Sequence, residues 1–386
     1  MSDVFIIGAG CSVPYGFPTG AMLMQKLKNF DYGTKFPREP YDISDIFLVD
    51  LYQERFGCSS ADCKRLGIDI EWSLPSTNDE ALYNQMMDGI VLPFSQSIRN
   101  SMMVSTDEFL KNRLGQKQNE QTDFGKRLIA YEILKAEQTS RLWNIDWIQH
   151  LLSRIDQQDN WKEILKQTVF LTFNYDRVLE YCIFLYLTSD KQYSDADAHA
   201  FIKEMQIHHV NGFIGSLEEI PFGAVENGKY QEIAKRMETV WEKRRNRDVS
   251  EKEKYQGFLK NAERVYFMGF SYIPDNLESI GIPRGAEIIR NAKVYATAMG
   301  LSPQNRLRIS TYLDLMDFEK RNEPEPMPEI EVQYQPFKNS IMRQQEYKQK
   351  EKWAKDQIRS RRIRYENRIL KDASAVDLIL DYYTLA

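Results

Sequence analysis

The chain has 386 residues, of which 42% are hydrophobic and 28% are charged, and its formal net charge at pH 7 is −5. This length predicts two or three domains with room for a sizeable core. The charge gives no general bias toward nucleic acid, and no apolar stretch approaches the roughly twenty residues of a membrane helix. We therefore expect a soluble cytoplasmic protein that neither enters a membrane nor binds nucleic acid directly.

Four cysteines, Cys11, Cys58, Cys63 and Cys182, form no Cys-x-x-Cys pair. Since no secretory signal precedes them, this pattern predicts reduced thiols in the cytoplasm and disfavours a zinc ribbon. No metal site is expected.

The first apolar run, Val4 to Ile7, is short, β-branched and aromatic, and it predicts a buried strand. The following Gly8-Ala9-Gly10 lets the backbone turn sharply and lets its N–H groups approach a ligand, and Ser12 adds a hydroxyl donor. A phosphate is the natural ligand for such a turn. The dinucleotide fingerprint Gly-x-Gly-x-x-Gly is not complete, because Val13 stands at its third glycine.

Helical patterns dominate residues 22–166 and separate the strand patterns that follow. This alternation predicts a parallel sheet with helices on its faces. We therefore expect an α/β protein with a Rossmann-like parallel sheet, a helical insertion at about 22–166 and a C-terminal helical tail. The expected strands after the insertion are 169–173, 207–210, 264–270 and 293–299.

Prolines and glutamates interleave in 321–330, which is typical of an extended connector. Beyond it, 343–371 is strongly charged and mainly basic, and it predicts either a solvated helix or one that docks to a partner or to nucleic acid. The expected domains are residues 1–300, including the insertion, a helix and linker at 301–330, and a charged helical tail at 331–386.

Three further stretches place polar residues after predicted strands. Asn174 and Asp176 lie in TFNYDRVLE, His208–Ser216 reads HHVNGFIGS, and Phe267–Glu278 reads FMGFSYIPDNLE. The carboxyl ends of parallel strands line the ligand crevice of a sheet, so these residues are site candidates. Helix capping is the alternative interpretation of the Asn and Asp residues.

Together these motifs make the chain resemble the sirtuin-like family, in particular the NAD-hydrolysing branch of bacterial antiphage defence. Gly8–Ser12 matches the family's Gly-Ala-Gly-x-Ser loop, and Thr172–Asp176 resembles its Thr-Gln-Asn-Ile-Asp segment. Gly269–Ser271 is similar to its Gly-Thr-Ser, and Thr106–Leu110 (TDEFL) resembles a short segment of the defence branch. The likeness covers roughly residues 1–300.

The departures from the family pattern limit which of the family's activities the chain is expected to have. Zinc-dependent deacetylases of the family carry four paired cysteines, which this chain lacks, so protein deacylation is disfavoured. Phe173 replaces the family's Gln, and Asn211 stands where a histidine normally precedes the glycine of the His-Gly element.

The resemblance implies an NAD+ glycohydrolase that yields nicotinamide and ADP-ribose, with NAD+ as substrate and no cofactor. His209 is the expected general base or ribose-hydroxyl partner, because residues 209 and 211 share a strand face. Structural packing is the alternative for this histidine. The other implied roles are pyrophosphate binding by Gly8, Ala9, Gly10 and Ser12, adenosine binding by Gly269 and Ser271, ordering of ribose and water by Asn174, and carboxamide contact by Asp176.

Family members are held silent by self-assembly or by a partner, so the resemblance also implies a homo-oligomer and a hexameric HerA-type ATPase as partner. Two other functions stay open. One is an NAD(P)-linked oxidoreductase, and the other is a non-catalytic nucleotide-binding subunit of a defence complex, which Asn211 favours.

Overall fold

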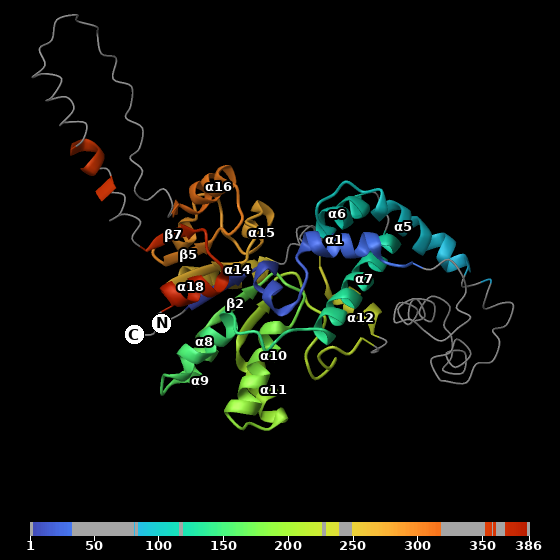
Figure 1. The fold of residues 1–386 in the computed structure, drawn as a ribbon, viewed down its shortest axis with the longest axis horizontal. Coiled ribbons are helices and arrows are strands. Elements are labelled where there is room, and N and C mark those ends of the chain that lie inside the picture. The colour runs from blue at the N-terminus through green and yellow to red at the C-terminus, as the bar shows by residue number, and fades with distance from the viewer. Residues whose placement is uncertain are drawn as a thin grey trace, which may run out of the picture.

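A seven-stranded, all-parallel sheet forms the centre of the computed structural model (Figure 1). The strand order is β3-β2-β1-β4-β5-β7-β6. From β1 the chain adds β2 and β3 on one side of the sheet, and it then adds β4 and the later strands on the other side. The predicted α/β class and Rossmann-like sheet are thereby confirmed. The strands are β1 Asp3–Ile7, β2 Val169–Thr172, β3 Gln206–His209, β4 Arg264–Met268, β5 Lys293–Thr297, β6 Met316–Asp317 and β7 Arg368–Lys371.

Parts of three segments discussed above fall outside the residues that the structure describes. These are the linker at 321–330, most of the basic stretch at 343–371, and the part of the insertion that holds Cys58 and Cys63. The described residues are 3–32, 81, 84–115, 119–225, 229–238, 249–317, 352–356, 358–359 and 367–383.

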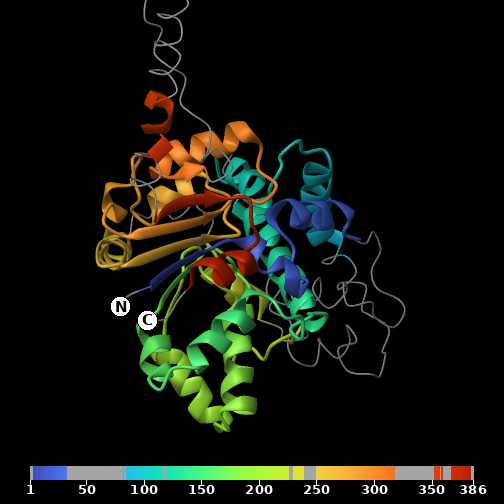
Figure 2. The same ribbon diagram turned by 60° about the vertical axis from the view of Figure 1, so that its left-hand side comes forward.

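Both faces of the sheet are buried. Phe5 and Ile7 of β1 point into one apolar cluster, and Val4 and Ile6 point into another on the opposite face, because successive side chains of a strand alternate. A strand covered on both faces is apolar at every position, which explains why β1 has no polar side at its centre. The green helices α8 to α11 and the orange helix α16 lie on opposite sides of the sheet (Figure 2).

The predicted helical insertion lies between β1 and β2, where every regular element of the described residues is helical. Its helices α1, α5, α6 and α7 gather beside the sheet together with α12 (Figure 1). The insertion elements are α1 Gly20–Asn29, η3 Met87–Val91, α5 Leu92–Arg99, α6 Thr106–Gly115, α7 Asn119–Gln138, α8 Trp147–Asp156 and α9 Trp161–Gln167.

The remaining helices follow β2 in the chain. None of the described helices combines the length and the apolar character that a membrane span requires. Their bounds are α10 Val178–Leu185, η4 Tyr186–Asp190, α11 Asp195–Glu204, α12 Tyr230–Arg236, α14 Val249–Lys260, α15 Pro274–Ser279, α16 Pro303–Leu313 and α18 Ala375–Tyr382.

A buried ion pair joins the insertion to the sheet. Arg177, just after β2, is 1% exposed, and it donates from Nε and Nη2 to Glu137 of α7 at 3.0 and 2.6 Å. The same guanidinium donates to the carbonyls of Gly215 and Ser216. A bidentate pair of this kind fixes the relative position of the elements that carry it.

The end of the chain returns to the sheet, which corrects the expected tail at 331–386. Its helix is present as α18, but Arg368–Lys371 form β7 between β5 and β6. Ile369 and Leu370 of this strand are buried, and the Arg368 side chain donates to the carbonyls of Leu313 and Asp314. The strand has only two apolar residues between charged ones, so it does not stand out in a basic stretch.

We expect Leu370→Ala to lower the free energy of unfolding by about 2–5 kcal/mol, because it removes a fully buried side chain from the sheet. Leu380→Ala is the matched control, since Leu380 is 45% exposed on α18 and its truncation should change stability by less than about 0.5 kcal/mol. Urea unfolding measures both. Equal stability of the two variants would show that β7 is not part of the folded sheet.

Candidate active site

A cavity of about 740 Å³ lies at the carboxyl ends of the strands. Gly8 follows β1, Asn174 follows β2 and Gly269 follows β4, and all three line it. The winding direction of the sheet reverses between β1 and β4, which is where open α/β sheets bind their ligands. The position of the cavity therefore makes it the candidate active site.

Four helices begin at the wall of this cavity. Thr19 at the start of α1, Ser105 before α6, Asp146 before α8 and Ser374 before α18 all line it. Aligned peptide dipoles give each helix N-terminus a partial positive charge that favours anions. The charged side chains that line the cavity are Asp107, Glu108, Lys111, Asp146 and Asp275.

The two glycine turns that follow β1 and β4 touch each other directly. A Cβ on Gly8 would lie 2.4 Å from the Gly269 carbonyl oxygen, and a Cβ on Gly10 would lie 2.9 Å from Gly269 Cα. Gly269 itself has a φ of +55°, and a Cβ there would lie 2.4 Å from the Cys11 nitrogen. These glycines are required because two backbones cross here.

The amides of the first turn are used inside the protein. Gly8 N donates to Met268 O, Gly10 N to Gly269 O, Cys11 N to Gly8 O and Ser12 N to Ala9 O, all at 3.0–3.1 Å. The sequence predicts that this turn presents its N–H groups to a phosphate, and these four do not. Gly8, Ala9 and Gly10 do line the cavity. The N–H groups of Gly8 and Gly10, however, are hydrogen-bonded within the protein and do not point to a ligand.

Asn174 is held by almost every polar atom it has. Its N–H donates to Thr172 Oγ1 at 3.1 Å, and its Nδ2 donates to Gly8 O at 3.3 Å and to Ser12 Oγ at 3.0 Å. Its carbonyl lies 2.9 Å from His209 Nδ1. The side-chain oxygen Oδ1 is buried and has no partner within the described part of the chain, and Asn174 is one of the residues that line the cavity.

Ser12 and Asp176 lie behind Asn174 rather than in the cavity wall. The Ser12 hydroxyl accepts from Asn174 Nδ2 and is hydrogen-bonded to Asp176, whose Oδ1 also accepts from Val178 N. Burial raises the pKa of Asp176 to about 6, and these hydrogen bonds oppose that rise. Both residues therefore position Asn174, whereas the resemblance implies direct contact with the dinucleotide.

His209 also lies behind Asn174, with its side chain only 6% exposed. Because the Asn174 carbonyl can only accept, Nδ1 carries a proton, and Nε2 lies 2.5 Å from the Glu180 carboxylate. Burial disfavours the imidazolium, but Glu180 and the Asn174 carbonyl outweigh it and raise the pKa of His209. Both ring nitrogens are occupied, which does not fit the expected role of general base.

Asn211, at the place of the family's histidine, does line the cavity. Its Oδ1 is a second buried amide oxygen without a partner among the described residues. Of the predicted site residues, Gly8, Ala9, Gly10, Asn174, Gly269 and Ser271 line the cavity, and Ser12, Asp176 and His209 support it from behind.

Sequence reasoning missed Glu180 and Asp107. Glu180 lies four residues after Asp176, within the first turn of α10, and that spacing was the available signal for a second carboxylate near the motif. Asp107 belongs to the TDEFL segment, which marks a resemblance without assigning a role to its carboxylate.

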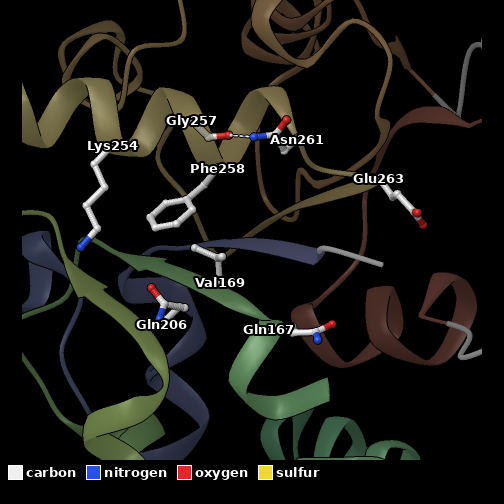
Figure 3. A pocket seen from close by; sticks show the side chains of 8 residues that line it. All are labelled: Gln167, Val169, Gln206, Lys254, Gly257, Phe258, Asn261 and Glu263. Carbon is white, nitrogen blue, oxygen red and sulfur yellow. Dashed lines mark hydrogen bonds between the residues drawn. The ribbon is translucent and has the colours of Figure 1, made fainter. Parts of the chain in front are cut away.

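A second hollow lies at the amino ends of the strands, opposite to the first cavity. It is formed between α14 and the first residues of β2 and β3 (Figure 3). Phe258 points toward Val169, and Asn261, just after α14, donates to the Gly257 carbonyl of that helix. Its lining includes no buried side-chain atom without a partner in the described part of the chain. The hollow therefore lacks the feature that marks the first cavity as a ligand site.

No model of a known protein family and no curated protein sequence matches the chain. Among the described residues, no group of three or more His, Cys, Asp or Glu side chains could hold a metal ion. Cys11 and Cys182 are both buried free thiols. The function must therefore be argued from the cavity itself.

We expect Gly10→Ala to lower the free energy of unfolding by about 1–3 kcal/mol, because the new methyl group would meet the Gly269 backbone. Gly257→Ala is the matched control. A Cβ at Gly257 meets nothing within 4 Å and lies inside α14, so this change should stabilise by up to about 1 kcal/mol. Thermal unfolding of the two variants distinguishes them, and a stable Gly10→Ala protein would contradict the crossing of the turns.

The two adjacent histidines of β3 should titrate far apart. Burial lowers the pKa of His208 to about 4, whereas the Glu180 carboxylate raises that of His209 above its ordinary 6.5. The His209 pair should therefore stabilise the fold fully below about pH 6.5 and lose this contribution as the pH rises through the folded pKa. NMR of histidine-labelled protein measures both values, and Glu180→Gln should lower only that of His209. A His209 pKa at or below 6.5 would contradict the imidazolium.

Proposed function

We propose that the protein is an NAD+ glycohydrolase, which cleaves NAD+ to nicotinamide and ADP-ribose. The observation that carries this proposal is the buried, unpartnered Oδ1 of Asn174, a residue that lines the cavity at the reversal point of the sheet. Asn211 Oδ1 offers a second acceptor of the same kind. Two fixed acceptors suit a ligand rich in O–H and N–H donors. In NAD+ the ribose hydroxyls supply O–H donors, and the carboxamide supplies N–H donors.

The chemistry asks little covalent participation from the protein. The nicotinamide of NAD+ is a cationic leaving group, and its departure leaves positive charge on the ribose. The protein must hold the dinucleotide, orient the ribose and place a water opposite the leaving group. An asparagine whose other polar atoms are all fixed is suited to orienting the ribose and the water.

The other walls suit the rest of the dinucleotide. The start of α1 at Thr19 to Ala21 would receive the pyrophosphate through its helix dipole. Ser271 and the apolar side chains of Ile273 and Met299, which follow β4 and β5, would receive the adenosine. The cavity volume of about 740 Å³ lies within the range of cofactor and small-ligand sites.

The biological setting is proposed on the resemblance of the sequence motifs. In that setting the enzyme acts in the cytoplasm and depletes NAD+ during phage infection. A homo-oligomer or a hexameric HerA-type ATPase partner would keep it silent until then. Direct nucleic-acid binding and membrane contact form no part of this proposal.

The experiment is an assay of nicotinamide release from NAD+ by the purified full chain, together with NAD+ levels in cells that express it. Asn174→Ala should reduce release at least about 100-fold, because it removes the fixed acceptor. Asn160→Ala is the matched control, since Asn160 is exposed beside α9 and its side chain caps nothing. Thermal melting should show both variants folded.

Three outcomes would contradict the proposal. Full activity of Asn174→Ala would remove Asn174 from the mechanism. Reduction of the nicotinamide ring, seen as an absorbance change without nicotinamide release, would indicate the oxidoreductase. Binding of NAD+ without turnover in the assay and without NAD+ loss in cells would indicate the non-catalytic subunit.

A further inference from the structure

Hydrolysis of NAD+ releases a proton, so the cavity needs a group that takes a proton from the attacking water. His209 cannot take it, because both its ring nitrogens are occupied by Asn174 and Glu180. Asn211 has no acid–base chemistry near neutral pH. Asp176 lies behind Ser12, outside the cavity wall. None of the residues to which the family motifs assign a role supplies the base.

Asp107 supplies a carboxylate in the right place. It lies in the first turn of α6, lines the cavity that Asn174 and Asn211 also line, and comes from the insertion rather than from the sheet. The hydroxyl of Tyr175 lies 3.5 Å from its Oδ1. This contact joins the carboxylate to the side chain of the residue that directly follows Asn174.

We propose that Asp107 is the general base of the glycohydrolase, an assignment that rests on the function proposed above. The water oxygen forms a bond to C1′ of the nicotinamide ribose while its proton passes to an Asp107 carboxylate oxygen. The bond between C1′ and the nicotinamide nitrogen breaks, and its electron pair leaves with nicotinamide, which becomes neutral. Asp107 later gives the proton to solvent, so the balance is one NAD+ and one water to nicotinamide, ADP-ribose and a proton.

The environment of Asp107 suits this role. Burial raises the pKa of Asp107, and the Tyr175 hydroxyl opposes the rise only in part. A carboxylate with a raised pKa is a stronger base toward water than an exposed one. The other charged groups that share the cavity with it are Glu108 and Lys111 of α6, Asp146 before α8 and Asp275 of α15.

The position of Asp107 in the cavity depends on how the insertion packs. Helix α6 packs against α7, and α7 carries Glu137, the partner of Arg177. Arg177 follows Asn174 by three residues. The buried ion pair therefore links the helices that carry Asp107 to the segment after β2 that carries Asn174, although these lie in separate parts of the sequence.

The test compares wild type, Asp107→Asn and Asp159→Asn in the nicotinamide-release assay with the full chain. Asp107→Asn keeps the shape of the side chain and should lower kcat at least about 100-fold while the Kd for NAD+, measured by calorimetry, changes less than about threefold. Asp159, exposed between α8 and α9, is the control for loss of one negative charge and should retain wild-type rates.

The pH profile and a rescue separate a base from a structural residue. Wild-type kcat should rise with pH as Asp107 loses its proton, and the residual rate of Asp107→Asn should lack this acid limb. In Asp107→Ala, added azide should restore turnover and give ADP-ribosyl azide, because azide attacks C1′ without giving up a proton. Asp107→Ala also serves if Asp107→Asn fails to fold.

The outcomes distinguish this assignment from the function on which it rests. An active wild type with Asp107→Asn within threefold of it overturns the assignment and leaves the glycohydrolase standing. Lost activity with an unchanged acid limb in Asp107→Asn, and no azide product in Asp107→Ala, also overturns it, because a structural role would give that result. A wild type that releases no nicotinamide overturns both.

Discussion

The close crossing of the glycine turns after β1 and β4 is the constraint on which the rest of the site depends. At Gly8, Gly10 and Gly269 the two backbones are so near that a methyl group on any of them would meet backbone atoms within 3 Å. This contact fixes the point where the sheet changes its winding direction. It also fixes the Gly8 carbonyl and Ser12, the two groups that hold the side-chain amide of Asn174.

The polar groups behind the cavity act as one support for a single acceptor. His209, paired with the buried Glu180, donates from Nδ1 to the Asn174 carbonyl. The Ser12 hydroxyl accepts from the Asn174 side chain and is hydrogen-bonded to Asp176. Burying such a network costs desolvation free energy unless every member is satisfied. Here the satisfied members stand behind Asn174, and the unsatisfied oxygen belongs to Asn174 itself, which lines the cavity. A preorganised acceptor of this kind requires no rearrangement when substrate arrives.

Sequence patterns predicted β1, β2, β4 and β5, because these strands are mainly apolar runs bounded by helical or turn sequence. They also predicted the insertion and β3, although Ile207 is the single aliphatic residue of β3. They did not predict β7, where Ile369 and Leu370 are the only apolar residues among charged neighbours. At the site, strand alternation predicted that residues 209 and 211 share a strand face. It did not reveal the Glu180 carboxylate that changes the chemistry of His209, because that contact depends on how α10 packs. The sequence marked Gly8, Gly10 and Gly269 as ligand-binding residues. The structure gives another reason for these glycines, the close approach of the two backbones, which motif spacing does not reveal. No role could be assigned to Asp107 from the sequence, because it is far from Asn174 along the chain and only the fold brings both residues to the same cavity.

The most direct test of the central claim is a crystal structure of the full chain with ADP-ribose bound. The account predicts a ribose hydroxyl within about 3.2 Å of Asn174 Oδ1 and the diphosphate at the start of α1. ADP-ribose in the hollow beneath α14, or in the first cavity with Asn174 and Asn211 oxygens untouched, would contradict it.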